Sequence, residues 1–214
     1  MRKHIVCFGD SNTHGYCAMN DGRFTEEERW TCLLQKNLGE EYLILEEGLS
    51  GRTTCFDDPL FEGLSGLNYI YPCLMSHEPV DLLIIMLGTN DTKERFGASA
   101  PCIGLGMKRL VQKAMSVTDC WKDKKPNILI VTPQNIGKEY ENSGVRGTMG
   151  AGCAEKSQGL GKEFKEIARL TGCHYLDAND VVTAAPNDID HMHLTKEGHR
   201  QLAEALTEKI KEIL

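Results

Sequence analysis

Short apolar runs alternate along the chain with stretches in which apolar residues recur at helical spacing. The runs cover residues 5–8, 42–45, 82–87, 128–131 and 174–176. Runs of this length, bounded by turn residues, predict buried strands. The run Leu82–Leu87 is apolar on both faces, which is typical of a central strand in a parallel sheet.

Between these runs, apolar residues recur every three or four positions, which predicts helices. The predicted helices cover residues 30–38, 69–76, 103–117, 156–170 and a last stretch from about residue 196. Gly39 closes the first helix. In the third, we expect Leu105, Leu110, Val111 and Met115 to face the core.

Strand and helix thus alternate five times, which predicts an α/β protein with a parallel sheet and helices on both faces. Internal repeats, linkers and composition breaks are absent from the sequence, so we expect a single domain over residues 1–214. A loop of about twenty residues follows Pro133. Such a length is unusual in a compact domain and is typical of a functional loop.

Composition narrows the class of protein. Hydrophobic and charged fractions of 41% and 26% are those of a soluble globular protein. The net charge of -7, with no basic run, argues against a nucleic-acid partner. Residues 1–4 lead directly into the first strand, without an apolar signal segment, and no run is long enough to span a bilayer. We therefore expect a cytoplasmic protein without a membrane partner.

The nine cysteines are scattered and never spaced C-x-x-C. This spacing favours neither a disulfide framework nor a zinc site. We expect most of them to be small buried apolar groups.

Polar stretches follow four of the predicted strands, and ligands of open α/β sheets bind at the carboxyl ends of strands. A serine nucleophile needs a base, an orienting carboxylate and donors for an oxyanion. We therefore expect Ser11 to attack, His193 to accept its proton and Asp190 to orient the imidazole. The backbone N–H groups of Ser11 and Gly51 and the side chain of Asn90 are the expected oxyanion donors.

Each of these residues also has an ordinary structural interpretation. Ser11 or Asn90 could cap a helix, and Gly51 could make a turn. Asp190 and His193 could belong to a polar loop, or His191 and His193 could form half of a metal site. Further ligands at recognisable spacing are missing, so we expect no metal. The joint occurrence at successive strand ends favours catalysis.

The segment 188–193 contains two overlapping D-x-x-H frames. One pairs Asp188 with His191, and the other pairs Asp190 with His193. We favour the second, because His193 lies just before Thr195, a suitable N-cap for the final helix, and a base needs rigid support.

Four short blocks of the sequence resemble those of the SGNH hydrolases, the GDSL-type esterases. The blocks are Gly9-Asp10-Ser11-Asn12, Ser50-Gly51, Gly88-Thr89-Asn90-Asp91 and Asp190-x-x-His193. The resemblance extends over nearly the whole chain. The runs Glu46–Thr54, Asp57–Pro59 and Met86–Lys93 are further similar to the bacterial arylesterase/acyltransferase branch.

This resemblance implies a three-layer α/β/α, flavodoxin-like fold with a five-stranded parallel sheet and no cofactor. It implies a serine esterase that processes short-chain acyl esters through an acyl-enzyme, with transfer to alcohols as a second outcome, and a homo-oligomer. Position 12 carries asparagine where the family name implies leucine. Within the matching blocks we expect substrate contacts from Asp10, Asn12, His14 and Arg52, and His14 replaces an aromatic residue of the branch.

Two alternatives stay open at this point. A carbohydrate O-acetylesterase uses the same machinery and differs in its leaving group. A non-catalytic flavodoxin-like binding protein could hold a phosphate on Ser11, Asn12 and Thr13, but it has no use for a paired Asp190 and His193. The patterns G-x-S-x-G, Walker A and G-x-G-x-x-G do not occur at these positions, which argues against an α/β-hydrolase elbow and nucleotide loops.

Overall fold

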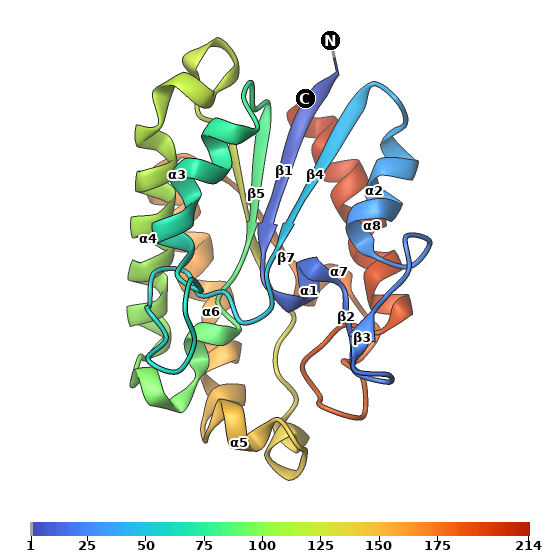
Figure 1. Ribbon diagram of the computed structural model, residues 1–214, viewed down its shortest axis with the longest axis vertical. Coiled ribbons are helices and arrows are strands. Elements are labelled where there is room, and N and C mark those ends of the chain that lie inside the picture. Colours follow the sequence, from blue (N-terminus) through green and yellow to red (C-terminus); the bar gives the residue numbers. More distant parts are fainter. Residues whose placement is uncertain (1) are drawn as a thin grey trace.

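A computed structural model describes residues 2–214 of the chain. Its centre is a five-stranded parallel sheet in the order β4-β1-β5-β6-β7 (Figure 1). The strands are β1 (Lys3–Gly9), β4 (Tyr42–Gly48), β5 (Leu82–Met86), β6 (Ile128–Thr132) and β7 (His174–Asp177). Each contains, or nearly coincides with, one of the predicted apolar runs, so the predicted strands are confirmed.

Helices cover both faces of the sheet, which gives three layers (Figure 1). One face carries α3 (Gly66–Ser76), α4 (Ala100–Ser116) and α6 (Cys153–Thr171), and the other carries α2 (Trp30–Leu38) and α8 (Lys196–Ile213). Because side chains alternate along a strand, β1 supplies both cores. Val6 and Phe8 pack under the first group of helices, and Ile5 and Cys7 under the second.

The expectation for Leu105 is wrong. Leu110 and Val111 are buried in the core as expected and Met115 packs against it, but Leu105 is 63% exposed. The buried face of α4 includes Ile103 and Met107. Leu105 lies two residues from each, about 200° around the helix, and so faces outward.

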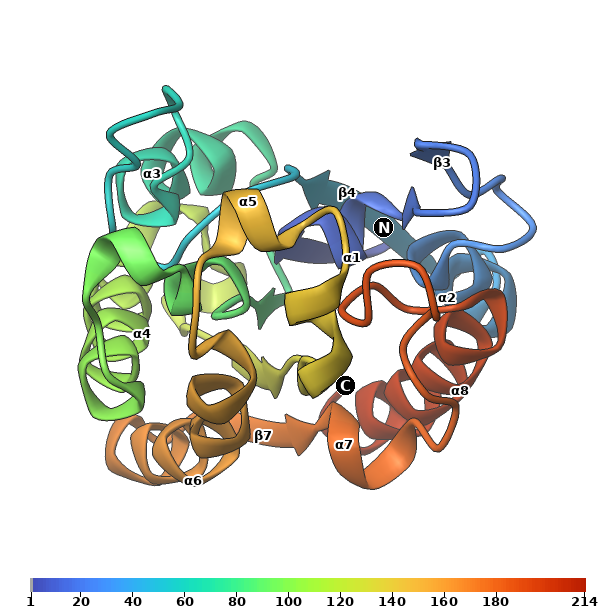
Figure 2. The ribbon, with the colours of Figure 1, turned by 90° about the horizontal axis from the view of Figure 1, so that it is seen from below.

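Several short elements gather at the carboxyl ends of the strands (Figure 2). They are α1 (Ser11–His14), the hairpin β2 (Tyr16–Cys17) and β3 (Gly22–Arg23), α5 (Arg146–Met149), α7 (Ala178–Val181) and the 3-10 turns η1 (Asn90–Thr92), η2 (Glu94–Phe96) and η5 (Lys138–Asn142). Two further 3-10 turns, η3 (Thr118–Cys120) and η4 (Lys122–Lys124), precede β6. The small hairpin is not visible in the hydrophobic pattern.

The long loop after Pro133 has a small core of its own. Ile136, Tyr140 and Met149 are buried there together with Met192 from the far end of the chain. The loop is therefore an ordered cap over one end of the sheet.

All nine cysteines are free, and five of them are buried. Within residues 2–214, every helix is too short or too polar to cross a membrane.

Candidate active site

Ser11 lies at the end of β1, beside the point where the strand order reverses between β1 and β5. Asp10 caps the short helix α1 by accepting a hydrogen bond from the Asn12 N–H at 3.0 Å. A Cβ atom at Gly9 would lie 2.0 Å from Thr13 Oγ1. Only glycine therefore permits this tight turn, which presents Ser11 at the place where open sheets bind ligands.

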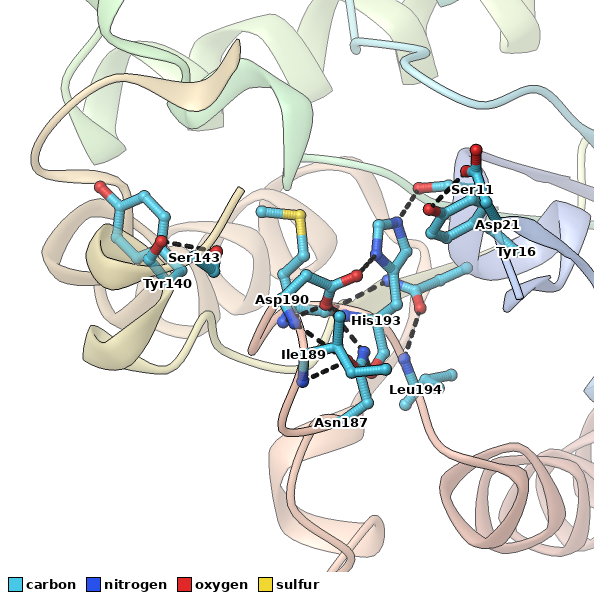
Figure 3. Close-up of polar contacts among 12 residues, drawn as sticks. Ser11, Tyr16, Asp21, Tyr140, Ser143, Asn187, Ile189, Asp190, His193 and Leu194 are labelled. Carbon is cyan, nitrogen blue, oxygen red and sulfur yellow. Dashed lines mark hydrogen bonds and ion pairs between the residues drawn. The ribbon is translucent and has the colours of Figure 1, made fainter. Parts of the chain in front are cut away.

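A chain of hydrogen bonds joins Ser11, His193 and Asp190 (Figure 3). His193 Nε2 lies 2.8 Å from Ser11 Oγ, and His193 Nδ1 lies 2.8 Å from Asp190 Oδ2. Ser11 caps no helix, and both ring nitrogens of His193 are already engaged. This arrangement fits neither the helix-cap interpretation of Ser11 nor a metal site formed with His191.

Asp190 is held by a dense set of donors. Its Oδ1 accepts hydrogen bonds from the Asn187 side chain at 2.7 Å and from the N–H groups of Met192 and His193 at 3.0 Å each. Burial works to raise the pKa of Asp190, but the hydrogen bonds and the charge of His193 hold it well below its usual value. Asp190 is thus ionised and can stabilise a positive imidazole.

The two D-x-x-H frames differ clearly in their surroundings. Asp188 is exposed, whereas Asp190 is buried and paired with His193. His191 has a φ of 59°, and its carbonyl oxygen accepts the Gly137 N–H at 2.7 Å, which fixes the backbone rather than placing the ring at Ser11. The structure therefore has the frame that we favour from the sequence.

Thr195 caps the following helix, as predicted from the sequence. Its hydroxyl accepts a hydrogen bond from the Gly198 N–H at 3.1 Å. The cap fixes the start of α8 two residues after His193, so the imidazole is attached to a rigid element.

Ser11, Gly51 and Asn90, the residues from which we expect the oxyanion donors, line the same pocket as His193. Gly51 has a φ of 88°, a conformation that favours glycine. Asn90 Nδ2 donates to Asp10 Oδ2 at 3.4 Å rather than capping η1. Gly51 does make a turn, since the Arg52 N–H donates to the Leu49 carbonyl at 3.0 Å, and this turn is compatible with a role as donor. The side chain of Asn90 caps no helix.

Two further carboxyl groups are buried beside this cluster. Asp10 and Asp91 are at most 1% exposed, and burial raises the pKa of each to about 6. Asp91 accepts hydrogen bonds from the Thr54 N–H and hydroxyl, which joins the turn after β5 to the loop that carries Gly51.

The pocket over Ser11 is a cavity of about 450 Å³. We call it the Ser11 pocket. Apolar and polar residues from six separate segments line it: Ser11, Tyr16, Ser50, Gly51, Phe61, Glu62, Leu64, Thr89, Asn90, Lys93, Val145, Thr148, Met149, Met192 and His193. Several large apolar side chains make it suitable for an acyl chain or an aromatic group.

The four expected substrate contacts are not among these lining residues. Asn12 accepts the Leu194 N–H at 2.9 Å, and Arg52 donates to the Gly9 carbonyl at 3.0 Å. The carbonyl oxygen of His14 accepts a hydrogen bond from Arg23 Nε, and the Asp10 carboxylate accepts from the Asn12 N–H and from Asn90. Asp10, Asn12 and Arg52 thus have hydrogen-bond partners in the turns around Ser11, and the role of these residues and of His14 as substrate contacts stays a prediction.

Sequence reasoning missed two neighbours of His193. The Asn187 side chain binds Asp190 and also donates to the His193 carbonyl at 2.9 Å. The spacing Asn187-x-x-Asp190, typical of a side-chain-stabilised turn, was an available signal. The Tyr16 ring lies 4.6 Å from the imidazole, centroid to centroid (Figure 3). No sequence pattern indicates that contact, because the hairpin itself is not predicted.

One group of side chains in residues 2–214 has the composition of a metal site. The ligand atoms of Glu47, Cys73 and His77 lie within 4.8 Å of one another. His77 Nε2 is 2.7 Å from Glu47 Oε1, so these two side chains already pair with each other. The group does not line the Ser11 pocket.

Comparison with known proteins agrees with this geometry. Residues 7–201 match the model of the GDSL-like lipase/acylhydrolase family. The chain belongs to this family. It is a GDSL-type serine esterase of the SGNH group, and its fold is the α/β fold of its structural neighbours.

Solved structures support the arylesterase branch. An aryl esterase from M. smegmatis is 34% identical, with a TM-score of 0.88 and coverage of 99% of this chain and 100% of that one. A carbohydrate acetylesterase from Sinorhizobium meliloti is 33% identical, with a TM-score of 0.88 and 100% of both chains covered. A putative arylesterase from Agrobacterium tumefaciens is 32% identical, with a TM-score of 0.87 and coverage of 99% and 100%. A search of curated proteins finds no significant match.

Proposed function

We propose that this GDSL-type esterase hydrolyses short-chain acyl esters, with Ser11 as nucleophile, His193 as base and Asp190 as the orienting carboxylate. The observation that carries the proposal is the continuous hydrogen-bonded chain from Ser11 Oγ to Asp190 Oδ2, with 2.8 Å at each step, at the wall of the Ser11 pocket. These are the distances that activation of a serine by a histidine requires.

In the first half-reaction, Ser11 Oγ attacks the ester carbonyl and its proton passes to His193 Nε2. Asp190 accepts a hydrogen bond from the Nδ1–H and stabilises the positive imidazolium by its negative charge. The N–H groups of Ser11 and Gly51 and the amide of Asn90 donate to the oxyanion. When the tetrahedral intermediate collapses, the alcohol leaves with the proton from Nε2, and the acyl group stays on Ser11.

In the second half-reaction, water attacks the acyl carbonyl and gives a proton to His193 Nε2. The bond between the acyl group and Ser11 Oγ then breaks, Nε2 returns the proton to Oγ, and the carboxylic acid leaves. An alcohol in place of water gives a new ester, which is acyl transfer. Both outcomes need the same residues, so the ratio of water to alcohol in the pocket decides between them. The apolar side chains that line the pocket favour alcohols with an apolar body.

A second candidate is the removal of O-acetyl groups from carbohydrates. The S. meliloti carbohydrate acetylesterase, 33% identical over the whole chain, favours it. The chemistry at Ser11 is the same, and the two functions differ only in whether the leaving alcohol is small and apolar or a sugar hydroxyl.

The test is a screen of p-nitrophenyl esters from acetate to octanoate, together with acetylated xylose. We expect the highest kcat/KM between acetate and butyrate, because the resembling branch processes short acyl groups. A fluorophosphonate probe should add one phosphonyl group to the protein and none to Ser11→Ala. Labelling that survives the substitution contradicts the assignment of Ser11, and a preference for octanoate over acetate contradicts the short-chain proposal.

A further inference from the structure

Two segments that are far apart in the sequence contribute to the wall of the Ser11 pocket. The loop 57–64, before α3, contributes Phe61, Glu62 and Leu64, and the segment 145–149 contributes Val145, Thr148 and Met149. Both lie beyond the carboxyl ends of the strands, and neither contains a strand of the sheet (Figure 2). What holds these two segments together therefore sets the width of the pocket between them.

Arg95, in the 3-10 turn η2, binds both segments at once. Its Nε and Nη2 donate to the two carboxylate oxygens of Asp58, at 3.1 and 2.6 Å. Its Nη1 donates to the carbonyl oxygen of Thr148 at 2.6 Å. All three nitrogens of one guanidinium are thus used to join one wall to the other, while Arg95 itself does not line the pocket.

The ion pair with Asp58 is buried, which makes it firmer than a surface pair. The Asp58 side chain is fully buried, and that of Arg95 is 18% exposed. Burial works to raise the pKa of Asp58, but the hydrogen bonds from Arg95 and Leu60 and the nearby Lys93 ammonium lower it, so the carboxylate is charged. Bidentate pairing of arginine with a buried carboxylate fixes the geometry as well as the distance.

Phe61, the pocket-lining residue of the loop 57–64 with the largest side chain, lies beside this ion pair. Phe61 is 53% exposed, and the Arg95 guanidinium lies 6.0 Å from the centre of its ring. On the other wall, Glu94 accepts the Ala151 N–H at 2.8 Å. The turn η2 therefore holds both walls from outside, and Arg95 is the residue that touches both.

We propose that Arg95 determines acyl-chain selectivity by clamping the loop 57–64 to the segment 145–149, and so restricts the pocket to short acyl groups. This inference rests on the proposed esterase function. Arg95 is a positioning residue, because it acts through the walls and touches neither Ser11 nor the oxyanion donors. Without the clamp the walls separate, and longer acyl chains find room.

The experiment measures kcat and KM of Arg95→Met for p-nitrophenyl acetate and octanoate. We expect the octanoate-to-acetate ratio of kcat/KM to rise roughly tenfold, since a single methylene in an apolar pocket changes specificity by about 10-fold or more. The change should appear mainly in the KM for octanoate, with the kcat for acetate within about twofold. Arg95→Lys, which can reach Asp58 but cannot make all three bonds, should restore part of the selectivity.

Arg146→Gln is the matched control. Arg146 lies in the segment 145–149, its side chain is 42% exposed, and it forms an ion pair with Glu94 at 4.0 Å and takes no part in the Asp58–Arg95–Thr148 clamp, so its removal should leave the ratio unchanged. Asp58→Asn removes the other half of the pair and should move the ratio in the same direction as Arg95→Met. If Arg95→Met does not fold, the ratio measured for Asp58→Asn tests the inference in its place.

A ratio within twofold of wild type in the folded Arg95 and Asp58 variants overturns the inference. So does an equal shift in Arg146→Gln. If instead the wild-type protein hydrolyses none of the esters, the proposed function has failed. If the wild type is an active esterase and the ratio does not move, only the role of Arg95 has failed.

Discussion

Carboxyl groups on the two sides of Ser11 are all buried, yet their pKa values move in opposite directions. Asp190, on the His193 side, is 3% exposed, and its pKa lies well below the usual value. Asp10 and Asp91, on the Asn90 side, are 1% and 0% exposed, and their pKa values are raised to about 6. Burial alone therefore does not decide the charge.

The difference lies in the donors and charges that face each group. Asp190 accepts three hydrogen bonds from neutral donors and faces the His193 ring nitrogen at 2.8 Å. Asp10 accepts one short bond from the Asn12 N–H and one long bond, at 3.4 Å, from Asn90. Asp91 also accepts hydrogen bonds from Thr54, but its donors are neutral and the negative charge of Asp10 raises its pKa. The facing imidazole of His193, added to the neutral donors, offsets the cost of burying the charge of Asp190, whereas the contacts of Asp10 and Asp91 do not offset it. One side of Ser11 is thus built to keep a negative charge. On the other side, near the expected position of the oxyanion, the raised pKa values of Asp10 and Asp91 make their negative charge less stable.

The largest effect should come from removing the imidazole that Asp190 faces. His193→Ala should lower kcat by roughly 10⁴-fold or more, about as much as Ser11→Ala, because members of such a triad act as a unit. His191→Ala should cost less than about tenfold, because its backbone, and not its ring, is engaged near Gly137. Steady-state kinetics on p-nitrophenyl acetate measures both variants.

Asp188→Asn is the control for the alternative D-x-x-H frame, since Asp188 is exposed. It should retain wild-type activity. If His191→Ala is inactive while His193→Ala turns over normally, the frame is wrong and the mechanism must be rebuilt around Asp188.

A smaller effect is expected on the other side of Ser11. Asn90→Ala should lower kcat by roughly 10²–10³-fold, the usual cost of one lost oxyanion donor. KM should change little, because the donor acts mainly in the transition state. The variant must be checked for an unchanged thermal midpoint, since Asn90 also donates to the buried Asp10. A loss of less than fivefold in kcat means that Asn90 is a structural residue of the turn after β5.

Those features that depend on short stretches of sequence were predictable. The strands follow from apolar runs, the Thr195 cap from its position before α8, and the spacing of Asp190 and His193 from a three-residue turn. Each is decided within a few residues, where periodicity and turn chemistry act directly. The orientation of Leu105 was the exception, since a wide apolar stripe does not say which of its residues is outermost.

Contacts between distant loops were not predictable. Asp58 and Arg95 are 37 residues apart, and Arg95 and Thr148 are 53 apart. Their meeting depends on how two irregular segments dock at the end of the sheet, and no local pattern records that docking. For the same reason the sequence did not show that the side chains of Arg52 and Asn12 bind backbone groups of other segments.

The smallest predicted effect concerns stability and uses the raised pKa of Asp91. A carboxyl group whose pKa is about 6 when folded, against about 4 when unfolded, binds more protons in the folded state between those values. The free energy of unfolding that it contributes is complete below pH 4 and is lost as the pH rises to 6. Asp91→Asn cannot titrate and keeps one carbonyl oxygen for Thr54. Its free energy of unfolding, from urea titrations at pH 4 to 7, should therefore fall less than that of the wild type over this interval, by about 2 kcal/mol. The exposed Asp188→Asn should track the wild type at every pH. Parallel curves for Asp91→Asn and the wild type would mean that Asp91 is ionised throughout, so that its bonds to Thr54 offset burial as fully as the donors around Asp190 do.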